Sequence, residues 1–233
     1  MASSANKGEQ GRALAAELVG QVALLRKRRG PALAVVLLRI LLGFAFLPAG
    51  LKKLIGEPFT DPANVGVFHE FLHAFFATGF FYRFVGGVQL VASLLMMTQR
   101  FAFAGELVFL PVLGAIFVFC WATGVVPTAI VVTLMSAGLV LLLLWEAPRL
   151  LASRPGEWLA PAESDSPVDL KLWGRAGGLV WLLYPLLSAL GGGIYRPRGL
   201  DFAEPGFWIT PGLVLILLVA ARIEQRTRRS RAG

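Results

Sequence analysis

The chain has 233 residues, of which 56% are hydrophobic and only 15% are charged, and its mean hydropathy is +0.69. A soluble domain usually carries about 25% charged residues, so this composition excludes both an ordinary soluble domain and a disordered chain. The net charge of +8 would indicate nucleic acid as a partner of a soluble protein; in so apolar a chain it indicates membrane topology, and we predict no nucleic-acid partner.

Residues 1–30 are predicted to form a cytoplasmic segment that is amphipathic and basic. Its apolar residues repeat at helical spacing, at Leu14, Leu18, Val22 and Leu25, and the basic run 26–29 follows them. This pattern is typical of a helix on the cytoplasmic membrane surface. A solvated tail that only orients the first span is the alternative, and the sequence leaves both open.

The first predicted span, at about residues 32–51, contains a stripe of charged residues, glycines and one phenylalanine at helical spacing. The stripe has spacings of 4, 3, 4 and 3 and consists of Arg39, Gly43, Phe46, Gly50 and Lys53. These spacings place all five on one face of a helix, where the glycines would let a neighbouring helix approach closely. The two charges would lie about 21 Å apart at 1.5 Å per residue.

A literal H-E-x-x-H string, formed by His69, Glu70 and His73, lies in a predicted interfacial helix at about residues 61–78. In zinc proteases this spacing puts two histidines on one helix face with a glutamate beside them. Here the apolar residues fall on the opposite face, and the chain has no third histidine. We therefore predict that these three residues lie on the polar face of a helix on the outer membrane surface and bind no zinc. The alternatives are a metal-binding or proton-linked role and a zinc metalloprotease.

The second predicted span, about 80–97, and the third, about 101–121, contain the remaining polar candidates. Gly86, Gln89 and Ser93 share one face of the second span, where a buried Gln89 would either hydrogen-bond to a neighbouring helix or hold a ligand carbonyl. Glu106 lies about five residues into the third span, in the same leaflet as Arg39. Because an isolated charge in a membrane is costly, we predict an Arg39–Glu106 pair. It would either fix helix register or form a pocket for a headgroup or a proton.

Three further spans complete the predicted fold, at about residues 126–145, 176–193 and 206–222. We predict an all-α polytopic membrane protein: a four-helix transmembrane bundle over 31–147 and a C-terminal two-helix hairpin over 176–223. A linker over 148–175 joins the two units, and a basic tail covers 224–233. With the N-terminus inside, 16 of the 22 basic residues fall on the cytoplasmic side, so both termini are predicted to be cytoplasmic.

Two stretches carry a resemblance to a known family. Residues 38–54 read LRILLGFAFLPAGLKKL, and the segments FVGGVQL (84–90), QRFAFAG (99–105) and LPV (110–112) follow. Together they resemble the DoxX-like integral membrane proteins, whose opening helix has the pattern R-x-x-x-G-x-x-F-x-x-x-G-x-x-K. The resemblance covers roughly residues 32–146 and implies a compact four-helix bundle with an amphipathic segment between its first two helices. Gln89 departs from it, since many members have glutamate there.

The resemblance implies a membrane component of a redox system, acting as an accessory or quinone-contacting subunit of a membrane oxidoreductase or respiratory-type complex. The ligand-pocket candidates are Arg39, Gln89, Ser93, Glu106 and Lys53. We predict no covalently bound cofactor; a quinone is the cofactor that the resemblance implies. The predicted partners are the lipid bilayer and other membrane or soluble redox subunits. The alternative function is a small-solute or ion transporter. The arginine-rich composition indicates that the membrane is a bacterial inner membrane.

Overall fold

The computed structural model describes residues 16–152, 166–191, 194, 203 and 205–232, and these are helical apart from their turns and loops. A first helical stretch covers residues 16–26. The helices that follow are α2 (Arg29–Ile55), α3 (Val67–Ala77), α4 (Phe80–Met97), α5 (Ala102–Ala122), α6 (Val126–Ala152), α7 (Leu170–Leu190), the short 3-10 helix η2 (Pro205–Trp208) and α8 (Ile209–Ala232). The predicted all-α class is confirmed for the described residues.

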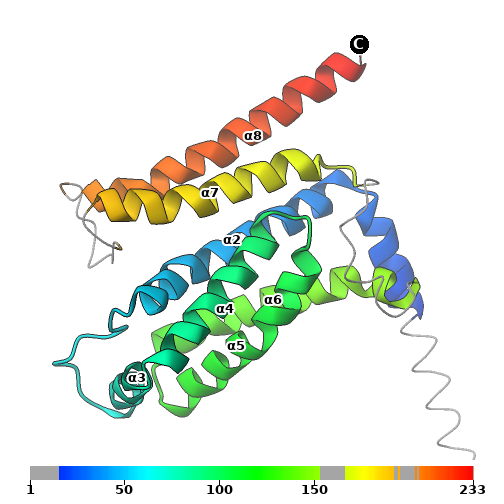
Figure 1. Ribbon diagram of the computed structural model, residues 1–233. Helices are drawn as coiled ribbons and strands as arrows, with labels where there is room; N and C mark the ends of the chain where they lie inside the picture. The colour runs from blue at the N-terminus through cyan, green and yellow to red at the C-terminus, as the bar shows by residue number, and fades with distance from the viewer. Residues whose placement is uncertain (1–15, 153–165, 192–193, 195–202, 204, 233) are drawn as a thin grey trace, which may run out of the picture.

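Four of these helices, α2, α4, α5 and α6, are long and apolar enough to cross a membrane. Each packs against the next, and α6 returns to α2, so the four form a bundle (Figure 1). This is the build of a multi-pass membrane protein. We call the end where α2 begins the basic end of the bundle and the opposite end, where α3 lies, the α3 end.

The contact between α2 and α4 depends on glycines. A Cβ on Gly86 would lie 2.8 Å from the Gly50 carbonyl oxygen, and a Cβ on Gly43 would lie 2.6 Å from Met97 Cγ. Real side chains do not approach so closely, so only glycine permits this separation of the two backbones. The close approach predicted from the first-span stripe is confirmed, and its partner is the second span.

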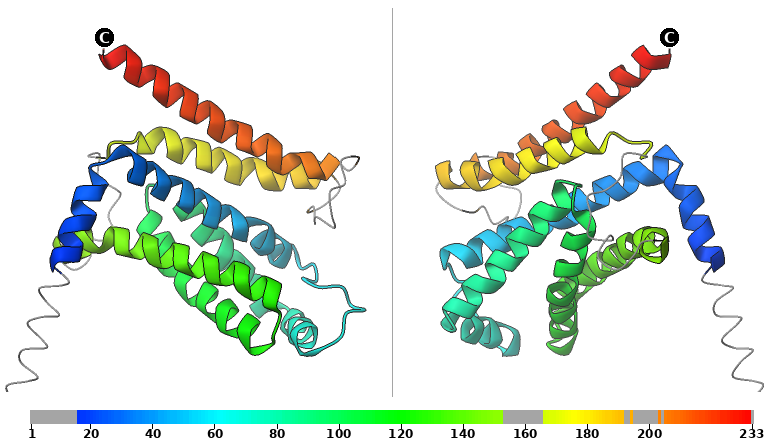
Figure 2. Two further views of the ribbon diagram at one scale, coloured as in Figure 1. Left: turned by 180° about the vertical axis from the view of Figure 1, so that it is seen from behind. Right: turned by 45° about the vertical axis from the view of Figure 1, so that its right-hand side comes forward.

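The helices α7 and α8 form an antiparallel hairpin against the outside of the bundle, over α2 and α4 (Figures 1 and 2). Gly174 and Gly177 of α7 lie directly against the backbone carbonyls of Thr98 and Met97, where a Cβ would have no room. One buried hydrophobic cluster joins α2 to this hairpin, and a second lies inside the bundle among α2, α4, α5 and α6. The helix α2 therefore contributes to both clusters.

Several helix ends differ from the predicted ones. The helix α6 continues to Ala152, beyond the predicted end of its span at about 145, and α7 begins at Leu170 rather than at about 176. Both ends of the predicted linker 148–175 are thus helical, and its middle, 153–165, lies outside the described residues, as do residues 1–15 of the predicted N-terminal segment. Asp169 caps α7, because its side chain accepts a hydrogen bond from the Leu172 N–H at 3.0 Å.

The interfacial helix begins at Val67, not at about residue 61 as predicted. The Asp61 side chain accepts a hydrogen bond from the Ala63 N–H at 2.9 Å and so forms a local turn instead of a helix cap. Gly66 ends the loop with a positive φ of 103°, a backbone conformation that favours glycine. The phenylalanines of α3 pack on the bundle, with the Phe71 ring 4.4 Å from the Phe119 ring of α5.

Candidate functional site

Three helices of the bundle bring one buried arginine and two buried glutamates together. Arg39 of α2 donates from Nε to Glu106 Oε1 of α5 at 2.8 Å, and from Nη2 to Glu146 Oε1 of α6 at 2.6 Å. The exposed fractions are 4% for Arg39, 0% for Glu106 and 4% for Glu146. One guanidinium therefore joins three helices through two charge-assisted hydrogen bonds in an apolar surrounding, where such bonds are strong and their loss is costly.

A fourth charge connects this cluster to the surface at the basic end. Arg26 Nη1 lies 3.9 Å from Glu146 Oε2 and donates to the Trp145 carbonyl oxygen at 3.1 Å. The Arg26 side chain is 34% exposed. The four residues form a row of alternating charge, Arg26–Glu146–Arg39–Glu106, that leads from a partly exposed guanidinium to a fully buried carboxylate. We call it the charged row.

The inner end of the charged row has unused hydrogen-bonding capacity. Glu106 Oε2 is buried and has no hydrogen-bond partner among the described residues. A buried carboxylate oxygen without a donor is unfavourable unless a proton, a water molecule or a ligand satisfies it. The arrangement can therefore hold a proton or a hydrogen-bond donor at Glu106.

The predicted Arg39–Glu106 pair is confirmed, whereas two members of the charged row were missed. Glu146 follows the predicted end of the fourth span at about residue 145, and it is the first charged residue after the apolar run that ends at Trp145. That position could have indicated its role, because a helix that continues past its apolar run keeps the next charged residue beside the helices that pack against it. In the sequence, Arg26 belongs to the basic run 26–29, and its position there does not distinguish it from its basic neighbours.

The two predicted polar residues of α4 lie at the contact with α2, apart from the charged row. Ser93 donates its hydroxyl to the Gly43 carbonyl oxygen at 2.7 Å, so this side chain forms a hydrogen bond between α4 and α2. Gln89 is buried with 1% exposure, and its Oε1 has no hydrogen-bond partner in the described part of the chain. Gln89 thus remains open to a donor, whereas the Ser93 hydroxyl is already used.

Lys53, the last residue of the stripe, lies near the α3 end. Its ammonium lies 4.4 Å from the centre of the Phe59 ring and 5.9 Å from that of Tyr82, and it donates to the Ala49 carbonyl oxygen at 3.3 Å. Aromatic faces stabilise a cation that is removed from water. All five stripe residues are buried in the structure. Lys53 nevertheless lies about 21 Å from Arg39 along α2 and belongs to a separate environment.

The H-E-x-x-H residues are held by the loop before α3. His69 Nδ1 lies 2.6 Å from Thr60 Oγ1, and His73 Nε2 lies 3.2 Å from the Asp61 carbonyl oxygen, both within hydrogen-bond distance. Glu70 is exposed. Within the described ranges, no group of three or more His, Cys, Asp or Glu side chains could hold a metal ion. The geometry gives the two histidines a structural use as anchors of this loop.

Two cavities in the described part of the chain are lined by residues other than the predicted pocket candidates. One, of about 530 Å³, lies between α2, α7 and α8 and is apolar. The other, of about 160 Å³, lies between α5 and α6, with Ser136 as a polar group in its lining. A headgroup pocket at Arg39, Gln89 and Glu106 would have to open from this packed state.

Comparisons with protein-family models, with curated proteins and with solved structures found no match to this chain. The resemblance to the DoxX-like proteins therefore stays a prediction that rests on the short motifs quoted above.

Proposed function

We propose that the chain is an integral membrane component of a redox system, and that it acts as an accessory subunit of a membrane oxidoreductase or respiratory-type complex. The observation that carries the proposal is the charged row, which ends on the buried Glu106 carboxylate with one oxygen lacking a partner in the described chain. Reduction of a quinone consumes protons together with electrons. A carboxyl group that is connected to one membrane surface would suit that chemistry, and the resemblance to the DoxX-like family supports the same class.

In this proposal α7 and α8 also cross the membrane, which gives six spans in a bacterial inner membrane. Both termini lie on the cytoplasmic side, at the basic end. Support comes from the basic residues there, which include Arg29 at the start of α2, Arg100 between α4 and α5, and Arg228 in α8. Such residues collect on the cytoplasmic flanks of spans.

The accessory role is better supported than direct quinone binding at Arg39, Gln89 and Glu106, because those residues do not line the larger cavity. A transporter would need a polar path between the leaflets. Between Arg39 and Lys53, the contact of α2 with α4 is closed by the glycine approaches, and the Ser93 hydroxyl is bonded to Gly43. This packing favours a static bundle.

The test is purification of the complex from native membranes in mild detergent, followed by spectroscopy for cytochromes, extraction of quinone and mass spectrometry of copurifying subunits. Glu106→Gln removes the carboxylate but keeps its shape, and Glu70→Gln, on the exposed face of α3, is the matched control. We expect copurifying redox subunits with all three chains and a lowered quinone-linked activity with Glu106→Gln alone. Purification without any redox partner or quinone, or full activity of Glu106→Gln, would overturn the proposal.

A further inference from the structure

An apolar groove runs along the outside of the molecule where α2 faces the α7–α8 hairpin. It has a volume of about 530 Å³, and its lining includes Leu37, Leu41, Val180, Leu213 and Leu217. Thr210 is the polar residue in the lining. Leu41 is 64% exposed, so the edge of the groove faces outward. In a bilayer this groove would be filled by a hydrocarbon chain.

Two arginines flank one buried carboxylate at the basic end of the same helices. Glu224 of α8 is 3% exposed; Arg29 Nη2 of α2 lies 3.6 Å from Glu224 Oε2, and Arg228 Nε lies 3.4 Å from Glu224 Oε1. Glu224 also accepts hydrogen bonds from Trp173 Nε1 at 3.0 Å and from the Asp169 N–H at 3.3 Å. These bonds fix the carboxylate between α7 and α8, so it holds both arginines in place and neutralises only one of them.

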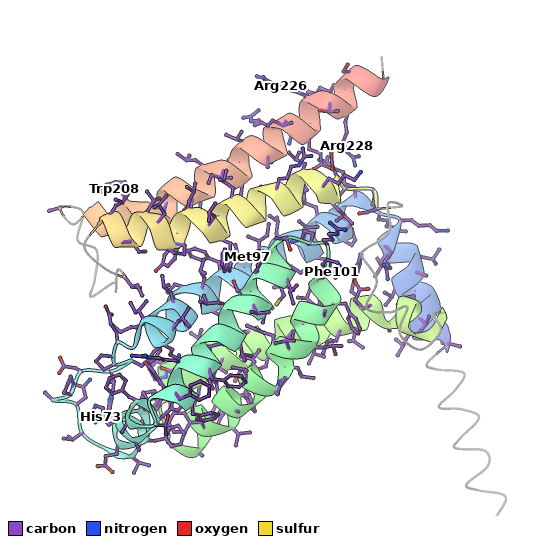
Figure 3. All side chains as sticks on the ribbon, in the orientation of Figure 1. His73, Met97, Phe101, Trp208, Arg226 and Arg228 are labelled. Atoms are coloured by element: carbon purple, nitrogen blue, oxygen red, sulfur yellow. The ribbon has the colours of Figure 1, made fainter. Side chains whose placement is uncertain are left out.

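The arginine pair lies beyond one end of the groove, at the basic end of α2 and α8. Arg228 follows Leu217 by 11 residues, which is about three helical turns and about 17 Å along α8, on the same side of the helix. Arg29 precedes the groove residue Ala34 by five residues, or about 8 Å along α2. Figure 3 shows Arg228 on the side of α8 that faces the other helices and Arg226 on the opposite side.

We propose that the groove and the arginine pair together bind one anionic phospholipid, with an acyl chain in the groove and the phosphate against Arg29 and Arg228. Along the helices the two arginines lie about 8 Å and about 17 Å from the nearest groove residues, so the phosphate would lie at the membrane surface and the acyl chain would run inward. A basic pocket between helices at the membrane surface is suited to an anionic headgroup. A quinone ring carries no charge and would not require two guanidinium groups. The proposal requires that the hairpin lie in the bilayer, and it does not depend on a redox role.

The test uses the full chain, delipidated in detergent and titrated with phosphatidylglycerol or with phosphatidylcholine of identical acyl chains, with binding followed by native mass spectrometry. We expect wild type to prefer phosphatidylglycerol and Arg228→Gln to bind it about fivefold more weakly. Arg226→Gln removes an equal charge from the opposite side of α8 and is the matched control; it should keep wild-type affinity. Val214→Trp, which fills the groove from a partly exposed position, should weaken both lipids.

Circular dichroism and gel filtration of each variant separate a binding defect from misfolding. Equal affinity of wild type for the two lipids would overturn the headgroup part of the proposal and leave only a hydrocarbon groove. Equal losses in Arg226→Gln and Arg228→Gln would assign the preference to general surface charge. Unchanged binding by Val214→Trp would remove the groove from the site.

Discussion

Arg39 Nη2 donates to Glu146 Oε1 at 2.6 Å, so the first long helix is tied to a residue 107 positions later in the chain. The same guanidinium bonds Glu106 through Nε. Because each helix-to-helix bond uses a different nitrogen, the two glutamates do not compete for one donor. The cluster therefore closes the bundle at its basic end, where α2, α5 and α6 meet.

Arg39→Leu should strongly destabilise the bundle, because it leaves the carboxylates of Glu106 and Glu146 buried without their main partner. Removal of one member of a buried ion pair typically costs about 3–5 kcal/mol. Unfolding of the purified protein in mixed detergent micelles measures the change. Arg100→Leu, at an exposed position in the α4–α5 turn, should change stability by less than about 0.5 kcal/mol. Equal stability of Arg39→Leu and wild type would contradict a structural role for the cluster.

Gly86→Ala should force α2 and α4 apart, because the added Cβ would lie 2.8 Å from the Gly50 carbonyl oxygen. Overpacking of this kind costs about 1–3 kcal/mol. Gly87→Ala is the matched control, since a Cβ at Gly87 would meet no atom within 4 Å. Thermal unfolding in detergent should separate these two variants. If both melted like wild type, the glycine contact would not determine the separation of the helices.

Labelling of single cysteines tests the six-span proposal. After Cys120→Ala, an impermeant maleimide on intact cells should label Glu70→Cys and Ala203→Cys, and should label Arg229→Cys only after permeabilisation. All three positions are exposed in the structure. Labelling of Glu70→Cys without Ala203→Cys would mean that α7 and α8 do not cross the membrane, although α2, α4, α5 and α6 do.

The histidines of α3 should act as loop anchors, so chelators should leave the melting temperature unchanged. Thr60→Val removes the hydroxyl that lies 2.6 Å from His69 Nδ1 and should cost about 1 kcal/mol. Thr227→Val is the control, because the exposed Thr227 hydroxyl bonds only a carbonyl of its own helix. Stoichiometric zinc in the purified protein, measured by mass spectrometry, would overturn this interpretation.

The bundle and the Arg39–Glu106 pair could be predicted because both follow from the cost of charge in an apolar medium. An arginine within a span needs a partner at the same depth, and Glu106 was the acidic residue that the span pattern placed there. The glycines on the Arg39 face predicted close packing for the same local reason. These inferences required only helical spacing and the direction of each span.

The rest of the site could not be predicted because it depends on where helices end and how they turn. Glu146 belongs to the cluster only because α6 continues past its apolar run, and the spacing of apolar residues does not define such an end. In the sequence, Glu224 is an acidic residue at the start of a basic tail. Only the packing of α8 places it beside Arg29 and Trp173. The start of α3 depends on a turn at Asp61 that competes with helix capping.

The sequence separation within the cluster has a consequence for biosynthesis. The Arg39 partners follow it by 67 and 107 residues. Ribosomes add about 5–20 residues per second, so Arg39 waits roughly 5 to 20 s for Glu146 to be synthesised. During that interval the Arg39 guanidinium lacks one or both of the carboxylates that it bonds in the finished bundle. Until α6 has been made, the desolvation of the Arg39 guanidinium has to be offset by other groups, such as lipid headgroups, water or the translocon.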